Sequence, residues 1–365
     1  MNIVYILATQ YDNLGDLIIN KELIRALSKQ GNVCVDATKV PKEFADELFN
    51  ELGGNVNRLA GSVRTPSFYW ELLAKKQLCD AVIFPPGAQV FGVSRKNFMS
   101  WAAQLLCIIV LRTLGVKVCC FGVSFNEDKQ SSLALLKWQL FSHIGVRSKK
   151  LTEQLRAKLN NVFYCPDLAM LLDRGEDVDR RESWGKYVVV SVRENIPQFS
   201  GGNYSKTLKE AIKTIVNQLD QFETVVILAQ VERDCAFMTE LNDYLLSSNK
   251  KTVILPQALN EKEVCGIYSA ADYVISNRLH VLLLAIINGA AIVTLTHENH
   301  FKLKNVLADL GLLETFIDIT SNKLELQSSL DKIILRSEEV VSQFTENKGH
   351  VESLIVKDIK QALGK

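Results

Sequence analysis

The stretch "AADYVISNRLHVLLLAIINGAAIVTL", residues 270–295, places a short β-branched run, a long apolar run and a second β-branched run in direct succession. The runs at 273–276 and 291–295 have the length and composition of buried strands, and the segment between them has the length of a helix. Two strands separated by one helix are typical of a parallel sheet. This stretch therefore predicts an α/β fold.

The same alternation of strands and helices continues in both directions. In the second half, further strand candidates lie at 187–193, 224–230 and 252–255. In the first half, strand candidates begin at Asn2 and lie at 81–84 and 116–123, with amphipathic or apolar helices at 17–30 and 100–114. We expect two doubly wound parallel sheets.

A charged segment without apolar periodicity, "DRGEDVDRRESWGK" at 173–186, interrupts the pattern and is interpreted as a linker. The predicted organisation is an N-terminal domain over 1–172, this linker, and a C-terminal domain over 187–330. Helices are expected over 331–365, closed by an amphipathic helix at 350–364.

Composition limits the function classes. Forty-two basic residues stand against forty-one acidic ones, so the overall charge gives no indication of nucleic-acid binding or of strong electrostatic docking on a membrane. Eight cysteines without a Cys-x-x-Cys pair, mostly in apolar surroundings, indicate reduced thiols and a reducing compartment.

No secretion signal or membrane-spanning segment is expected. The N-terminus "MNIVYILATQ" reads as a first strand, and the longest apolar runs are well short of the ~20 residues that a spanning helix needs. We therefore expect a soluble cytoplasmic protein. The run "WAAQLLCIIVL" at 101–111 is interpreted as a buried core helix, with lipid contact as the alternative.

Ligands of open parallel sheets bind outside the carboxyl ends of the strands. The polar residues that directly follow the predicted C-terminal strands are Arg193, Glu194, Gln230, Glu232, Arg233, Asp234, Gln257, Asn277, Arg278, His280, Thr296, His297 and His300. We expect side chains from these five loops to converge on one cleft.

Arg278 and His280 fall between the end of the strand 273–276 and the first turn of the next helix. Free backbone N–H groups and the helix dipole favour an anion there. An arginine adds a fork of donors that suits phosphate or carboxylate, and Arg193 ends another strand of the same sheet. The structural alternative is that Arg278 pairs with a carboxylate of the fold and that His280 is a satisfied first-turn residue.

The N-terminal domain carries a similar loop, "YDNLGD" at 11–16. Gly15 permits a tight turn, Asn13 lies beside it, and Asp16 can cap the following helix. A turn and a cap alone would explain these residues. Asp16 is nevertheless kept as a catalytic candidate.

The sequence lacks the short motifs of several common enzyme classes. The sequence has no Gly-x-x-x-x-Gly-Lys-Ser/Thr, Gly-x-Gly-x-x-Gly, Gly-x-Ser-x-Gly or His-Glu-x-x-His pattern. The segment "THENHF" at 296–301 holds two histidines and a glutamate, but no further ligands are apparent, so no metal site is expected.

Taken together, these residues resemble the bacterial polysaccharide pyruvyl transferases over most of the chain. The resemblance rests on "YDNLGD" (11–16), "IGVRSKKLTEQL" (144–155), "CPDLAMLL" (165–172), "VVVSVRE" (188–194) and, most specifically, on 270–295. It implies two Rossmann-like domains in a GT-B-like arrangement. Two departures are visible: Arg147 is followed by Ser148 where the family usually has Arg-Asp, and the glycine-rich N-terminal loop is replaced by "FPPGAQ" (84–89).

The resemblance implies an enzyme that transfers an enolpyruvyl group from phosphoenolpyruvate to two hydroxyls of a sugar, giving a cyclic pyruvate ketal and phosphate. Arg193 and Arg278 would bind the anionic groups of the donor, and His280 would act as general acid or protonate the leaving phosphate. The substrate-binding candidates are Arg193, Gln230, Asn277, Arg278, Leu279 and His297 with Asn13 and Gly15, and the catalytic candidates are His280 and Asp16.

No cofactor or metal is required by this chemistry. The acceptor is expected to be a precursor of a bacterial cell-surface glycan, bound on the N-terminal domain. If that precursor is lipid-linked, the enzyme would contact the inner face of the membrane peripherally. No nucleic-acid partner is expected.

Two other functions stay open. One is a glycosyltransferase of the same architecture with a nucleotide-sugar donor, whose retaining members often carry a glutamate after the strand near 276. Here no acidic residue lies between Asn277 and Glu298. The other is a catalytically silent glycan-binding protein of the same fold.

Overall fold

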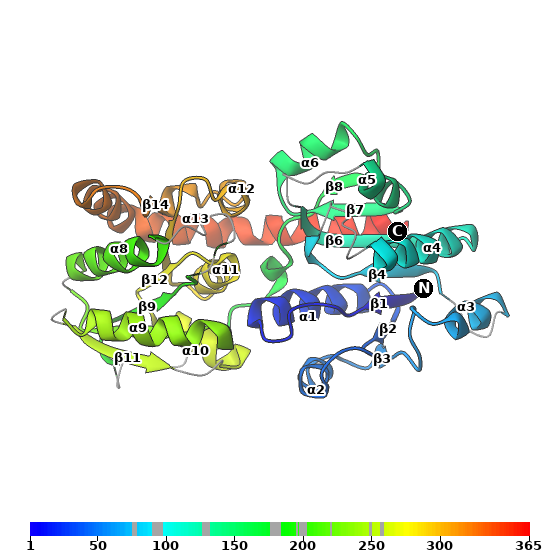
Figure 1. Cartoon of the computed structure of the whole chain (residues 1–365), viewed down its shortest axis with the longest axis horizontal. Helices are drawn as coiled ribbons and strands as arrows, with labels where there is room; N and C mark the ends of the chain where they lie inside the picture. Colours follow the sequence, from blue (N-terminus) through cyan, green and yellow to red (C-terminus); the bar gives the residue numbers. More distant parts are fainter. Residues whose placement is uncertain are drawn as a thin grey trace. The chain divides into compact units, whose positions relative to one another are not determined.

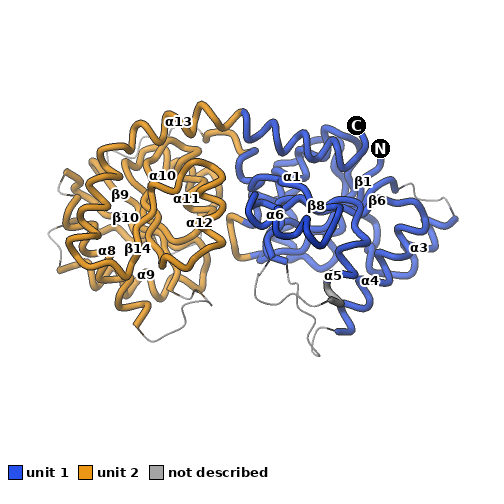
Figure 2. The backbone as a smooth tube through the Cα atoms, turned by 90° about the horizontal axis from the view of Figure 1, so that it is seen from above, with its two compact units in different colours: residues 1–11, 16–171, 350–365 blue, residues 12–15, 172–349 orange. Residues whose placement is uncertain are grey.

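The computed structural model describes residues 1–74, 79–89, 98–125, 132–175, 184–194, 196, 203–219, 221–247, 250–255 and 259–365. The chain forms two compact units, shown in different colours in Figure 2. Unit 1 comprises residues 1–11, 16–171 and 350–365, and unit 2 comprises residues 12–15 and 172–349.

Unit 1 is built on a parallel sheet with the order β3-β2-β1-β4-β6-β7-β8, and β5 pairs with β6 (Figure 1). Its strands are β1 Asn2–Ile6, β2 Asn32–Asp36, β3 Val56–Arg58, β4 Ala81–Phe84, β5 Gly87–Gln89, β6 Lys117–Phe125, β7 His143–Val146 and β8 Val162–Tyr164. Its helices are α1 Leu14–Ser28, α2 Lys42–Asn50, α3 Pro66–Leu73, α4 Phe98–Thr113, α5 Ser132–Gln139 and α6 Lys149–Arg156, with a 3-10 turn at Leu168–Leu171.

Unit 2 is built on a six-stranded parallel sheet with the order β11-β10-β9-β12-β13-β14. Its strands are β9 Tyr187–Ser191, β10 Thr224–Leu228, β11 Lys251–Leu255, β12 Tyr273–Ser276, β13 Ala291–Thr296 and β14 Phe316–Asp318. Its helices are α8 Tyr204–Gln218, α9 Cys235–Leu245, α10 Glu261–Ala270, α11 Leu279–Ile287, α12 Phe301–Asp309 and α13 Lys323–Leu363. The predicted fold of two doubly wound, Rossmann-like sheets is confirmed.

The order of strands explains where ligands can bind. In each sheet the chain winds outward in one direction from the first strand and then returns to the other side, so β9 lies beside β12 and β1 beside β4. The crevice at such a reversal lies outside the carboxyl ends of the two strands. In unit 2 those ends are Ser191 and Ser276, which are paired in register.

The apolar runs of the sequence become strands and helices that are covered on all sides. Every residue of β9, β10 and β12 is buried, because helices cover both faces of a parallel sheet. The seven residues 281–287 of α11 are all buried too. A helix as apolar as α11 is typical of such a buried position.

The C-terminal part of the chain differs in detail from the expectation of several helices after residue 330. One helix, α13, runs from Lys323 to Leu363. Its first half contributes Leu330 to the core of unit 2. Its last turns belong to unit 1, where the Asp358 carboxylate lies 2.8 Å from Nε2 of buried His143.

The eight cysteines are all free thiols, and four of them are fully buried. Helix α4, by contrast, is not the buried core helix that was expected. Only Ile108 and Leu111 of this helix are buried, while Met99 and Leu106 are largely exposed.

Candidate anion-binding site

The candidate site lies at the strand reversal of unit 2. Arg193 follows β9, and Asn277 and Arg278 follow β12, the neighbouring strand. Because the carboxyl ends of parallel strands meet at one edge of a sheet, the two arginines are brought to the same place from positions far apart in the sequence.

Asn277 fixes the backbone of Arg193. Its Oδ1 accepts a hydrogen bond from the Arg193 N–H at 2.8 Å, and its Nδ2 donates to the Arg193 carbonyl at 2.8 Å. The same Nδ2 lies 3.2 Å from the hydroxyl of Tyr204. Asn277 is only 1% exposed. It therefore acts through the arginine that it positions.

Ser276 performs the equivalent task for Arg278. Its hydroxyl donates to the carbonyl of Ser191 at 2.5 Å and accepts from the Arg278 N–H at 3.0 Å. Arg278 itself stands at the N-cap of α11 in an extended conformation. The two serines thus join the ends of both strands and fix the point at which α11 begins.

The Arg278 guanidinium forms a buried ion pair with Asp234, the residue directly before α9. This is the structural pairing that the sequence left open as an alternative. Burial lowers the pKa of Arg278 to about 10, in spite of Asp234 beside it, and an arginine with that pKa remains protonated at neutral pH. The pair holds the guanidinium in one orientation.

The site carries more positive than negative charge. Asp234 interacts electrostatically with both Arg193 and Arg278, so these two guanidinium groups share one carboxylate. Burial also lowers the pKa of Arg193. Within the described part of the chain, the Nε atoms of Arg193 and Arg278 are buried without a hydrogen-bond partner. Unpaired buried donors beside excess positive charge are suited to an anionic ligand.

Neutral polar groups line the same place. The hydroxyl of Thr296 lies 3.0 Å from Nδ1 of His300, which is buried. Burial, and then the charges of Arg193 and Lys302, lower the pKa of His300 to about 4. His300 is therefore neutral at physiological pH. Burial raises the pKa of Tyr204, so its hydroxyl keeps its proton.

Tyr204 was missed as a site residue by sequence reasoning. It is the first residue of α8, the helix that follows β9. The signal that could have found it is its position on the first helix after the reversal-point strand. Asp234 and His300 were among the strand-end residues, but neither was assigned a role.

His280 stands in the first turn of α11 and is half-buried. It contacts the loop 12–15, which belongs to unit 2. A Cβ atom at Gly15 would lie 2.3 Å from Nδ1 of His280, so only glycine fits there. Oδ1 of Asn13 accepts a hydrogen bond from the Gly15 N–H at 3.1 Å and caps the start of α1.

The expected capping by Asp16 is not what the structure has, since Asn13 fills that position. Asp16 lies inside the first turn of α1 in unit 1, where its carboxylate accepts from the Thr9 hydroxyl at 2.7 Å and from the Gln10 N–H at 3.2 Å. A catalytic role of Asp16 stays a prediction.

The other predicted residues are placed as follows. Gln230 is buried after β10, and Leu279 is half-buried beside Arg278. His297 is half-buried, and its Nδ1 accepts from the Asn299 N–H at 3.1 Å. Gln257 lies outside the described residues.

The serine that departs from the family pattern keeps a structural role in unit 1. Oγ of Ser148 accepts from the Leu151 N–H at 3.4 Å and caps α6. Serine and aspartate are both good helix caps, so this exchange preserves the start of the helix. Arg147 before it pairs with Asp167 at 2.9 Å.

Neither a metal-binding cluster nor a membrane-spanning helix is found among the residues that the structure describes. No group of three or more His, Cys, Asp or Glu side chains there could hold a metal ion. No helix in that part of the chain is long and apolar enough to cross a membrane.

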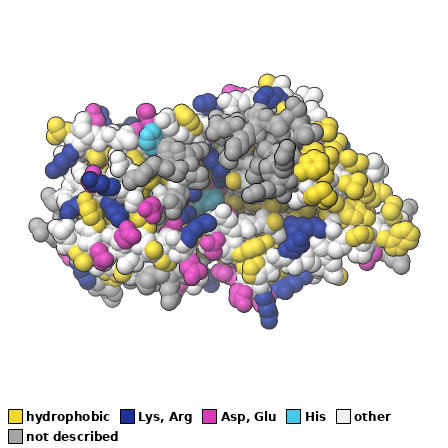
Figure 3. Space-filling model, viewed as in Figure 1, with side chains coloured by type: hydrophobic (Ala, Val, Ile, Leu, Met, Phe, Trp, Pro, Cys, Tyr) yellow, Lys and Arg dark blue, Asp and Glu magenta, His cyan; other side chains and the backbone are white. Residues whose placement is uncertain are grey.

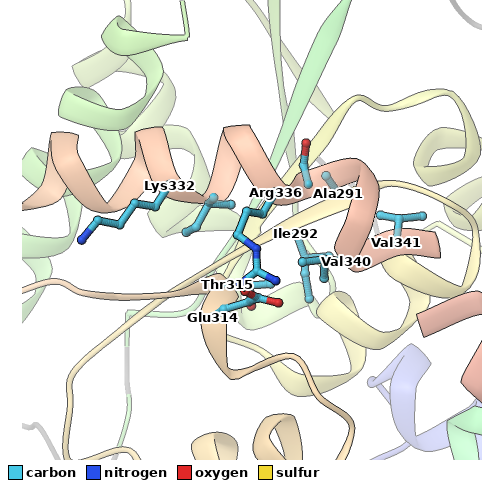
Figure 4. A pocket seen from close by; sticks show the side chains of 10 residues that line it. Ala291, Ile292, Glu314, Thr315, Lys332, Arg336, Val340 and Val341 are labelled. Carbon is cyan, nitrogen blue, oxygen red and sulfur yellow. Dashed lines mark hydrogen bonds and ion pairs between the residues drawn. The ribbon is translucent and has the colours of Figure 1, made fainter. Parts of the chain in front are cut away.

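A cavity of about 340 Å³ lies elsewhere in unit 2, between α13 and the beginning of β13 (Figure 4). It is lined by Ala291, the first residue of that strand, and by the ion pair of Arg336 with Glu314. Because it lies at the amino end of the strand, it is at the opposite edge of the sheet from the two arginines.

Comparisons with solved structures agree with this fold. The chain is similar to the UDP-GlcNAc 2-epimerase from Neisseria meningitidis bound to UDP-GlcNAc, with 13% identity, a TM-score of 0.63, and coverage of 99% of this chain and 100% of that one. It is similar to Anabaena Alr3699/HepE in complex with UDP, with 11% identity, a TM-score of 0.64 and full coverage of both chains. A glycosyltransferase from Rickettsia africae is 11% identical, with a TM-score of 0.60 and coverage of 99% and 98%.

Identities this low show the fold alone, which is of the GT-B type. No curated protein matches the sequence significantly. The family model described as Polysaccharide pyruvyl transferase matches residues 13–299, more than three quarters of the chain, including the loop at Gly15 and the site around Arg278. The chain belongs to the polysaccharide pyruvyl transferase family.

Proposed function

We propose that this protein transfers an enolpyruvyl group from phosphoenolpyruvate to two hydroxyls of a sugar in a glycan precursor. The observation that carries the proposal is that half-buried Arg193 and buried Arg278 lie together at the strand reversal of unit 2, with unpartnered Nε donors and excess positive charge. Phosphoenolpyruvate carries a phosphate and a carboxylate, and two arginine forks are suited to hold both.

In the proposed reaction, a proton is added to the methylene carbon of the donor and the first sugar hydroxyl bonds to the neighbouring carbon, losing its proton. The C–O bond to phosphate then breaks, and the second hydroxyl bonds to the same carbon and loses its proton. The products are a cyclic ketal bearing a methyl group and free phosphate. No oxidant or reductant is needed.

His280 is the proposed acid for the methylene carbon or for the leaving phosphate. Its support is its place two residues after Arg278 in the first turn of α11, only half-buried and packed on Gly15. Asp234 and Asn277 would act indirectly, since each holds an arginine in position. We place the acceptor on unit 1, where Asp16 is the further catalytic candidate.

The test is phosphate release from phosphoenolpyruvate by the purified protein, with and without acceptors that contain galactose, glucose or N-acetylmannosamine. We expect release that depends on an acceptor and that His280→Ala abolishes. Arg278→Lys should raise the KM for phosphoenolpyruvate, because a lysine cannot form the fork. Absence of both release and phosphoenolpyruvate binding would contradict the proposal.

The second candidate is transfer from a nucleotide-sugar donor. It is favoured by the solved structures of similar fold that hold UDP or UDP-GlcNAc. Calorimetric titration with UDP and with phosphoenolpyruvate separates the two: binding of UDP alone would favour the nucleotide-sugar reaction.

A further inference from the structure

Two helices of unit 1 expose large apolar side chains to solvent. On α3, Trp70 is 71% and Leu73 is 56% exposed, and on α4, Met99 is 77% and Leu106 is 63% exposed. Phe98 and Ile109 are exposed on α4 as well. These six residues are called the apolar patch: Trp70, Leu73, Phe98, Met99, Leu106 and Ile109.

The two helices are neighbours on one core. Phe68 of α3 and Ile108 of α4 belong to the same buried cluster of unit 1. Figure 3 shows hydrophobic side chains gathered over the end of the molecule that α3 and α4 occupy in Figure 1. The patch is therefore continuous rather than a scatter of single side chains, and patches of this kind mark interaction surfaces.

The spacing within α4 shows that the exposure is not an accident of one residue. Met99, Leu106 and Ile109 recur at helical intervals along the outer face, and Ile108 and Leu111 point into the core. A surface helix normally presents polar residues outward. The fold of unit 1 does not require apolar residues on this face.

The charge of the surrounding sequence points to one kind of partner. From Arg64 to Asn126, the segment that holds all six patch residues, the sequence has seven basic residues and two acidic ones, Glu71 and Asp80. This segment has a net charge of +5, whereas the whole chain has +1, so the rest of the chain has a net charge of −4. An apolar surface within a basic segment complements an anionic bilayer.

We propose that the apolar patch docks unit 1 onto an anionic lipid surface. Leu106 and Met99 enter the boundary between headgroups and acyl chains, and Trp70 lies at headgroup level, where its amphipathic ring is favoured. Docking by itself does not depend on the pyruvyl transfer. The further step, that it brings the enzyme to a lipid-linked acceptor, rests on the proposed function.

The experiment is flotation of the full-length protein with mixed phosphatidylcholine and phosphatidylglycerol vesicles. We expect Leu106→Glu to lower the vesicle partition coefficient by roughly tenfold or more. The substitution removes a leucine that docking would bury, and it introduces a negative charge that the anionic lipid repels. The matched control is Leu335→Glu on α13, where the leucine is 86% exposed outside the patch and wild-type binding is expected. Circular dichroism checks that both variants are folded.

Failure of the wild type to float with the vesicles would overturn the proposal, as would equal binding by the Leu106 and Leu335 variants. Sedimentation without lipid tests the competing occupant: self-association that Leu106→Glu abolishes, without vesicle binding, would assign the patch to a second copy of the chain. Phosphate release with a water-soluble acceptor should be unchanged in Leu106→Glu. Loss of docking and loss of transfer are therefore measured separately.

Discussion

Replacing Gly15 with alanine tests whether the loop 12–15 positions His280. The added Cβ would lie 2.3 Å from Nδ1 of His280 and 2.6 Å from its Cβ and Cγ, whereas ordinary contacts are 3.4–4 Å. The two groups must therefore separate by about 1 Å. The imidazole cannot simply swing aside by its tip, because its own Cβ is among the atoms overlapped.

A displacement of about 1 Å at a catalytic group costs about 100-fold in rate. We expect Gly15→Ala to lower kcat for acceptor-dependent phosphate release by about this factor, with a smaller change in the KM for phosphoenolpyruvate, because Arg193 and Arg278 are not overlapped. The strain should also lower the free energy of unfolding by about 1–3 kcal/mol. Urea unfolding measures this second effect.

Gly61→Ala is the control, since nothing lies within 4 Å of a Cβ built at Gly61. It should leave kcat and stability close to those of the wild type. If Gly15→Ala keeps the wild-type kcat while folding normally, then His280 either does not move or does not take part in the reaction. Either result refutes this account of the loop.

Three further predictions concern the site and the long helix. Asn277→Ala removes both hydrogen bonds to the Arg193 backbone and should raise the KM for phosphoenolpyruvate roughly tenfold; an unchanged KM in steady-state kinetics would show that Arg193 is held by other contacts. His300 has its pKa lowered to about 4 by burial, so the folded protein favours neutral His300. The stabilisation that comes from neutral His300 is complete above about pH 6.5, the pKa of histidine in an unfolded chain, and decreases by up to roughly 3 kcal/mol as the pH falls towards 4. In His300→Gln, the free energy of unfolding measured in urea should therefore depend less on pH over this range. Gly349→Ala, at an exposed position of α13 with open space around it, should raise the free energy of unfolding by about 0.5–1 kcal/mol in thermal unfolding, and a loss of stability would contradict this.

The sequence predicted the fold well where the pattern is local. Strands such as 187–191 and 273–276 are continuous apolar runs because they are buried on both faces of a parallel sheet, and that composition is visible without coordinates. The short strands at 56–58 and 162–164 carry too few residues to give such a signal. The sequence predicted the end of α13 at 350–364, where the amphipathic pattern is clear, but it did not predict that one helix runs from Lys323 to Leu363.

The apolar run at 101–111 shows the limit of this reasoning. An apolar run predicts a helix, but by itself it does not say how many sides of that helix are covered by neighbouring elements. The interpretation as a core helix was wrong because unit 1 covers only the side of α4 that carries Ile108 and Leu111. Nothing local distinguishes Leu106, which is 63% exposed, from these two buried neighbours.

The sequence by itself therefore determined the parallel α/β class, the family, and the placing of Arg193 and Arg278 at strand ends, since each depends on residues close together in the chain. Only the tertiary structure decided that Asp234 pairs with Arg278 across 44 residues and that Asn277 holds Arg193 across 84. It also decided that Gly15 packs on His280. The physical reason is that such contacts arise where strands adjacent in the sheet bring distant loops together, and the order of strands is set by packing of the whole unit.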